Sequence, residues 1–191
     1  MVEDAHNDPR RGGTIGSVGT AVKEGVVESL KGLNEVETEI VNLVRCTVSR
    51  TLKATGEVAS DSVAVTRDVV TGALQATAEV GIGLIVSTKS VTKGVVLGVH
   101  DVGGEVLSVA HQAVKGMVAG GAEMRADVAT VARSAVRGVI EAARETGGNV
   151  NETSQAAVQG ALEAAGALGH TAVEAVTDVL VGMGEGVTDV L

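Results

Sequence analysis

The chain has 191 residues, enough for one or two domains, and it contains no Phe, Tyr or Trp, one Pro and 26 Gly. Its formal net charge of −9 argues against nucleic acid as a partner and against strong attraction to anionic membranes. Cys46 is the single cysteine, which excludes an internal disulfide framework and leaves Val, Ala, Leu, Ile and Met to build any interior.

Residues 1–16 are polar and contain Pro9 and several glycines, so they are expected to form a flexible leader. The first residues lack the apolar run of a secretory signal, and no stretch approaches 18 uncharged apolar residues. The expected location is therefore cytoplasmic.

Residues 17–191 carry a repeat without insertions. The repeat unit has 22 residues and is marked by glycines at that interval: Gly72, Gly94, Gly116, Gly138, Gly160 and Gly182. Each unit divides into two halves of 11, and EAVTDVL (174–180) returns as EGVTDVL (185–191). Eleven residues make about three helical turns, so equivalent positions share one face of a helix. The period predicts an all-α protein of long amphipathic helices with 11-residue (hendecad) repeats. These helices are expected to pack as an elongated, straight or right-handed bundle or as an oligomeric assembly.

The abundance of Val, Thr and Gly lowers the helix propensity and raises a strand alternative. The period is not two, however, and runs such as AVRGVIEAARE (135–145) are typical of helices. An isolated helix of this composition would be weak, so packing against other helices must supply its stability.

Four Gly-rich points could end a helix: VGIG (80–83), VGG (102–104), AGG (119–121) and TGGNVNET (146–153). The break near 146–153 is the strongest, because Asn149 or Asn151 could cap a following helix. The unbroken register favours a helix that continues through these points. Tandem duplication alone would preserve the same spacing.

One face of the repeat collects apolar side chains. This predicted self-association face comprises Leu30, Val41, Leu52, Val58, Leu74, Val80, Ile85, Val96, Val102, Leu107, Val118, Ile140 and Leu162. So much apolar surface must meet another helix, another layer or lipid.

Charged residues border that face, with bases on one side and acids on the other. The predicted inter-helix charge flanks are Arg45, Arg67, Lys89, Arg133 and Arg144 with Glu35, Glu57, Asp68, Glu79, Asp101 and Glu123. A basic flank can pair with the acidic flank of a neighbouring helix, and small residues at other positions permit close approach. The alternative is a solvated face with local pairs such as Arg137–Glu141.

Site chemistry has little support in the sequence. His100 and His111 would lie about 16.5 Å apart along a helix, too far to share a metal. The GIG of residues 81–83 has no preceding strand and no following GK[ST], so it is not expected to bind phosphate. We expect no catalytic residue, cofactor, metal or small-molecule substrate.

VKEGVV (22–27) and VTKGVV (91–96) resemble the 11-residue lipid-surface repeats of synucleins. The period is also similar to that of apolipoproteins, perilipins, late-embryogenesis-abundant proteins and phasin-like granule coats. This resemblance implies amphipathic helices that cover a lipid or granule surface.

The leading expectation is a non-enzymatic structural protein whose helices self-associate side by side through the Val/Ala/Leu face into a bundle, tube or filament. Its partner is then itself. A peripheral coat on lipid droplets, storage granules or membranes is the alternative. A stress-protective protein of the desiccation type is the third hypothesis.

Overall fold

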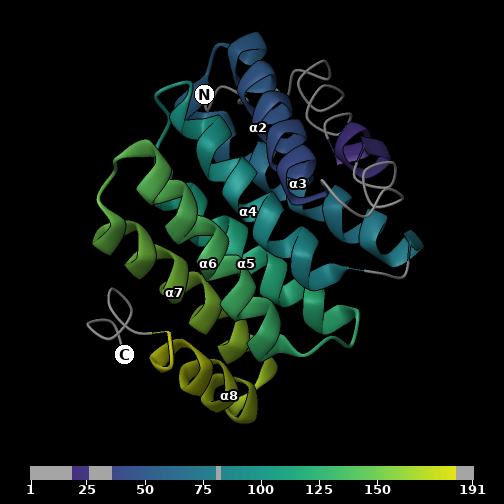
Figure 1. The fold of residues 1–191 in the computed structure, drawn as a ribbon, viewed down its shortest axis with the longest axis vertical. Coiled ribbons are helices and arrows are strands. Elements are labelled where there is room, and N and C mark those ends of the chain that lie inside the picture. The colour runs from purple at the N-terminus through teal and green to yellow at the C-terminus, as the bar shows by residue number, and fades with distance from the viewer. Residues whose placement is uncertain (1–18, 26–35, 81–82, 184–191) are drawn as a thin grey trace, which may run out of the picture.

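The computed structural model describes residues 19–25, 36–80 and 83–183, and every regular element within these ranges is helical (Figure 1). A helical segment at 19–25 precedes α2 (Val36–Thr55), α3 (Val58–Val80), α4 (Leu84–His100), α5 (Val106–Glu123), α6 (Val128–Thr146), α7 (Val150–Leu168) and α8 (His170–Val181). The prediction of an all-α fold is confirmed. None of the described helices is both long enough and apolar enough to cross a membrane.

The helices form two rows, because consecutive helices reverse direction while alternate helices lie side by side (Figure 1). The even row is α2, α4 and α6, and the odd row is the 19–25 segment, α3, α5 and α7. The carbonyls of Val41 and Arg45 face Gly94 and Gly98, which shows that α2 and α4 run parallel. α8 packs on both α6 and α7. Such a stack, in which each unit touches only near neighbours, has the organisation of a helical solenoid.

Short turns with a left-handed residue separate the helices. The residues with positive φ are Gly56, Gly83, Gly103, Arg125, Gly147 and Gly169. Glycine adopts this conformation without steric cost, so the chain reverses without backbone strain at each of these turns except the one at Arg125. The last four of these positions recur at the same interval as the repeat of the sequence.

The expectation of a helix that continues through the Gly-rich points is therefore wrong. α3 ends at Val80, α4 ends before 102–104, and α6 ends at Thr146, whereas 119–121 lies inside the last turns of α5. Of the two predicted capping residues, Asn149 and Asn151, it is Asn149 that caps α7: its Oδ1 accepts the backbone N–H groups of Asn151 (3.1 Å) and Glu152 (3.3 Å). The constant spacing of the glycines reflects repetition of a unit made of one helix and one turn.

Glycines in the middle of the helices let alternate helices approach closely. A Cβ added at Gly138 would lie within 3 Å of the Lys89 carbonyl oxygen, and one added at Gly160 within 3 Å of the His111 carbonyl oxygen. Real Cβ atoms essentially never come this close to another atom. At Gly138 the space also lets the Thr92 hydroxyl donate to the Ala135 carbonyl, at 3.1 Å. Small residues thus permit close helix packing as expected, here within a single chain.

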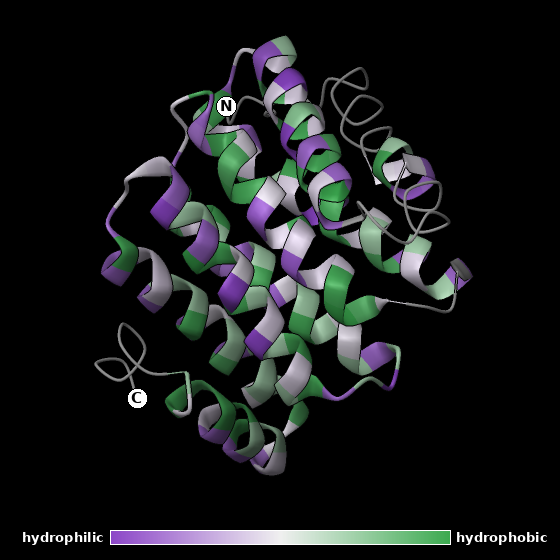
Figure 2. Cartoon of the chain, in the orientation of Figure 1, coloured by the Kyte–Doolittle hydropathy of each residue, from purple (hydrophilic) through white to green (hydrophobic). Residues whose placement is uncertain are grey.

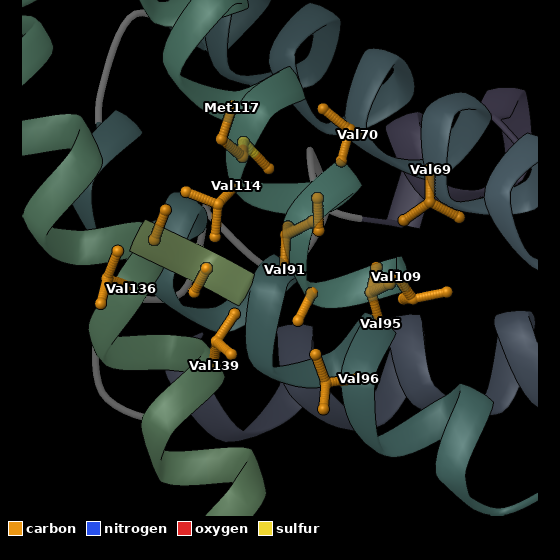
Figure 3. Packing of buried hydrophobic residues seen from close by; sticks show 14 of the residues in the cluster. Val69, Val70, Val91, Val95, Val96, Val109, Val114, Met117, Val136 and Val139 are labelled. Atoms are coloured by element: carbon orange, nitrogen blue, oxygen red, sulfur yellow. The ribbon is translucent and has the colours of Figure 1, made fainter. Parts of the chain in front are cut away.

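The core lies between the two rows and consists of Val and Ala with a few larger side chains. Val91, Val95 and Val96 of α4 meet side chains of α3, α5 and α6 at its centre (Figure 3). Full burial of each Val contributes about 1.5–3 kcal/mol, so packing offsets the weak helix propensity of the sequence. Figure 2 shows that each helix carries both hydrophilic and hydrophobic residues.

The predicted self-association face lies largely inside this chain. Leu52, Val96 and Val118 are buried, and Val41, Val58, Leu74, Val102, Ile140 and Leu162 are partly buried against the core. Ile85 and Leu107 are 50% and 38% exposed, since both lie in the first turn of a helix. Leu30 and the side chain of Val80 lie outside the described residues.

Candidate functional site

An ion pair joins the end of α4 to the middle of α2. Arg45 donates from Nε to Oδ2 of Asp101 at 2.6 Å and from Nη2 to Oδ1 at 2.8 Å. This two-pronged geometry is the strong form of a guanidinium–carboxylate contact. The hydrogen bonds from Arg45 lower the pKa of Asp101, and the pKa of Arg45 is raised in return.

Two lysines of α4 extend this pairing to α6. Lys89 Nζ lies 3.3 Å from Glu37 Oε2 and 3.1 Å from Glu141 Oε1, while Lys93 Nζ lies 2.9 Å from Glu145 Oε2. Partial burial opposes the charge of Lys89, but the hydrogen bonds and charges of Glu141 and Glu37 raise its pKa overall. The three helices of the even row are therefore joined by one charge network.

A small cavity of about 220 Å³ lies within this network. Ser90 is 1% exposed and lines the cavity, and its Oγ has no hydrogen-bond partner within the described part of the chain. Arg45 and Lys89 border the same cavity. A buried hydroxyl without a protein partner normally bonds to water, and this cavity has the polarity and volume to hold water.

The odd row carries the same kind of pairing. Glu163 of α7 lies 2.6 Å from Lys115 Nζ and 2.9 Å from His111 Nε2, both of α5. The hydrogen bond from Lys115 is the main cause of the lowered pKa of Glu163. Lys23 pairs with Glu79 where the 19–25 segment meets α3.

In both rows a base pairs with an acid on the helix two places later, at a separation along the chain that differs from one contact to the next. Arg45–Asp101 and Lys23–Glu79 are 56 residues apart, Lys89–Glu141 is 52 apart and Lys115–Glu163 is 48 apart. Exposed ion pairs are individually weak, so the repetition matters more than any single pair. The pairs fix how far alternate helices are shifted along their axes relative to each other in both rows.

The predicted charge flanks divide into two groups. The structure brings together Arg45 with Asp101, and it places Lys89 and Glu79 in other pairs between helices. Arg67, Arg133, Arg144 and Glu123 form no ion pair with another residue in ranges 19–25, 36–80 and 83–183, and Glu35 lies outside those ranges.

The two remaining acids of the flanks have local environments. Glu57 accepts a hydrogen bond from the Ser60 hydroxyl at 3.1 Å. One oxygen of Asp68 is buried without a hydrogen-bond partner among the described residues. Burial raises the pKa of Asp68, and nearby Arg67 only partly opposes this effect.

The sequence reasoning missed Glu37, Glu141 and Glu163 as members of the network. Glu141 and Glu163 hold the same position in successive units, so the repeat itself carried a signal for them. The local pair Arg137–Glu141 is replaced by contacts from Glu141 to Lys89 and Lys93.

A second cavity, of about 360 Å³, lies between α3 and α5. Val70, Leu74 and Ala119 contribute apolar walls, and Arg67 and Glu123 line it without forming an ion pair. No group of three or more His, Cys, Asp or Glu residues within the described ranges is placed to hold a metal ion.

No family model, curated protein or solved structure matches the chain. The class that the described geometry defines is a two-row helical stack with a charge network along one row and ion pairs along the other.

Proposed function

We propose that this protein is a non-enzymatic structural protein that self-associates by extending its own helical stack. The proposal rests on the repeated contact between alternate helices. Each of these contacts contains small residues, and most of them also contain an ion pair. Because alternate helices meet through the same kind of surface throughout the stack, the end helices of one copy can pack on those of another in the same way.

The α7–α8 end supplies a candidate association surface. Leu168 and Val181 are 46% and 49% exposed there, and a Cβ added at Gly166 would meet nothing within 4 Å. A contact between this end and the opposite end of a second copy is heterologous. Such contacts build rings or open filaments rather than simple pairs.

The position of the Val/Ala/Leu face argues against a lipid coat. Most of the described members of that face are buried or partly buried inside the chain. A coat on lipid droplets, granules or membranes would have to open these contacts before the face could enter acyl chains. Full helicity in plain buffer, unchanged when neutral vesicles are added, is the result expected from circular dichroism.

Sedimentation velocity and negative-stain electron microscopy over a range of concentrations test self-association. We expect the average mass to rise with concentration and rings or filaments to appear. Leu168→Ser should weaken the association, whereas Ile85→Ser, which changes an equally exposed side chain at the start of α4, should not. A protein that remains a monomer at every concentration would contradict the proposal.

A further inference from the structure

Three arginines of α6 form a basic row that has no acidic partner among the residues that the structure describes. Arg133, Arg137 and Arg144 are exposed and line a cavity of about 390 Å³ together with Ile140 and Met183. None of the three forms an ion pair with another residue of the described ranges. Glu141 also borders the cavity, but it is engaged by Lys89 and Lys93 of α4.

The equivalent bases on α4, the preceding helix of the even row, are paired. Lys89 and Lys93 stand two repeat units before Arg133 and Arg137, and they meet Glu141 and Glu145. Both pairs are 52 residues apart, and in each set the charges are four residues, or about one helical turn, apart. Two bases on one helix are thus matched by two acids on the helix two places later.

The same spacing counted from α6 leads to the end of the sequence. The residues 52 positions after Arg133 and Arg137 are Glu185 and Asp189. Both acids belong to residues 184–191, which lie outside the described ranges. The last residue of those ranges, Met183, lines the arginine cavity, so the two acids follow it directly along the chain.

We propose that residues 184–191 of the same chain dock in this cavity, with Glu185 and Asp189 pairing with Arg133 and Arg137. Charge complementarity, the 52-residue spacing of the two α4–α6 pairs and the place where the described chain stops all favour this occupant. Docking would give α6 the acidic partner that α6 itself gives to α4. This inference does not depend on self-association.

A cycle of charge reversals tests the docking. The α6 variant is Arg133→Glu with Arg137→Glu, the tail variant is Glu185→Arg with Asp189→Arg, and the third protein carries all four changes. Each variant alone should lower the melting temperature by about 2–4 °C, because it places like charges together. The combined variant should recover more than half of the summed loss. Additive losses, with no recovery, would overturn the proposal.

Matched controls separate docking from general charge effects. Arg67→Glu changes an exposed arginine of α3, and combining it with the tail variant should give no recovery. Arg133→Gln with Arg137→Gln removes the charges without reversing them and should make the protein insensitive to the tail variant. Far-UV circular dichroism confirms that each variant remains helical.

Two further measurements identify the occupant. Sedimentation velocity should show the same mass before and after the charge reversals; recovery that appears only in a larger species would place the acids of a second copy in the cavity and overturn docking within one chain. Sodium phosphate should stabilise the wild type no more than sodium chloride of equal ionic strength. A phosphate-specific gain that the α6 variant loses, without coupling to the tail, would instead identify an anion site.

Discussion

The α4–α6 contact and the α3–α5 contact occupy equivalent places in the two rows, but only the first is closed. In α4–α6 the glycine Gly138 lies against the backbone of Lys89, which also pairs with Glu141. In α3–α5 a Cβ added at Gly116 would meet only the Val70 side chain, at 3.0 Å, and a cavity of about 360 Å³ remains.

The two contacts also differ in the side chains at equivalent repeat positions. Leu74 of α3 packs against Gly120, whereas its equivalent in the next unit, Val96 of α4, is one methylene smaller and fully buried. Gly120 leaves room for Leu74, whereas α6 has Ala142 at the position equivalent to Gly120, and Arg67 and Glu123 on the cavity wall form no ion pair with each other. The repeat therefore determines which helices meet, and the residues at equivalent positions differ from one contact to the next.

The largest expected effect comes from filling the closed contact. Gly138→Ala should destabilise the protein by about 2–3 kcal/mol, because the new Cβ would collide with the rigid Lys89 backbone. Gly116→Ala should cost less, since Val70 can shift. Gly166→Ala is the control: its surroundings are open, so it should be neutral or stabilising by up to about 1 kcal/mol. Urea unfolding at pH 7 measures all three; equal losses would show that the two contacts do not differ.

A smaller effect is expected from the buried carboxylate in α3. Asp68→Asn should stabilise the protein by about 1 kcal/mol at pH 7, because it removes a charge whose oxygen is buried without a hydrogen-bond partner among the described residues. Since burial raises the folded-state pKa of Asp68, the wild type gains stability as the pH falls through that pKa toward the ordinary value. The advantage of the variant should therefore shrink on acidification. Asp178→Asn, at an exposed position, should show neither effect.

The Arg45–Asp101 ion pair of the even row should give the opposite pH dependence. Arg45→Met should cost about 0.5–1 kcal/mol at neutral pH, because the two side chains are 37% and 29% exposed. The folded-state pKa of Asp101 is lowered, so the pair's contribution is complete above about pH 5 and disappears as the pH falls through that lowered pKa. Unfolding at pH 7, 5 and 3 measures this loss. Arg67→Met, which removes an arginine of α3 that forms no ion pair within the described ranges, should change stability little at any of these pH values.

The smallest expected effect lies in the turn between α5 and α6. Arg125 has a φ of 58°, at a position where the other units have Gly103, Gly147 and Gly169. Arg125→Gly should raise stability by about 0.5 kcal/mol, because the left-handed conformation no longer strains a side chain. Arg67→Gly inside α3 should instead lower stability by about 1 kcal/mol. Thermal unfolding compares the two, and a loss with Arg125→Gly would contradict the interpretation of the turns.

The sequence was sufficient to predict helices and a cap at either Asn149 or Asn151, because the 11-residue phase and a capping residue are local signals. It was not sufficient to decide whether the helices continue, since a long helix and a repeated helix-and-turn unit have the same spacing. The decision rests on the left-handed backbone at Gly103, Gly147 and Gly169, a property of the fold.

Partners of the charged residues were harder to predict than their separation into two flanks. Arg45 and Asp101 are 56 residues apart, and they meet only because the chain reverses twice, before and after α3, and brings α4 alongside α2. The exposure of Ile85 was missed for a related reason: its place in the repeat matches buried residues, but it lies in the first turn of α4, where fewer neighbours cover it.

The alternation of the two rows constrains how a gene for such a chain can grow or shrink. Removing two consecutive units deletes one helix from each row and leaves every later helix on its original side. Removing a single unit would transfer all later helices to the other side, so the partners of each would be exchanged. Evolution of this architecture by duplication should therefore favour even numbers of units.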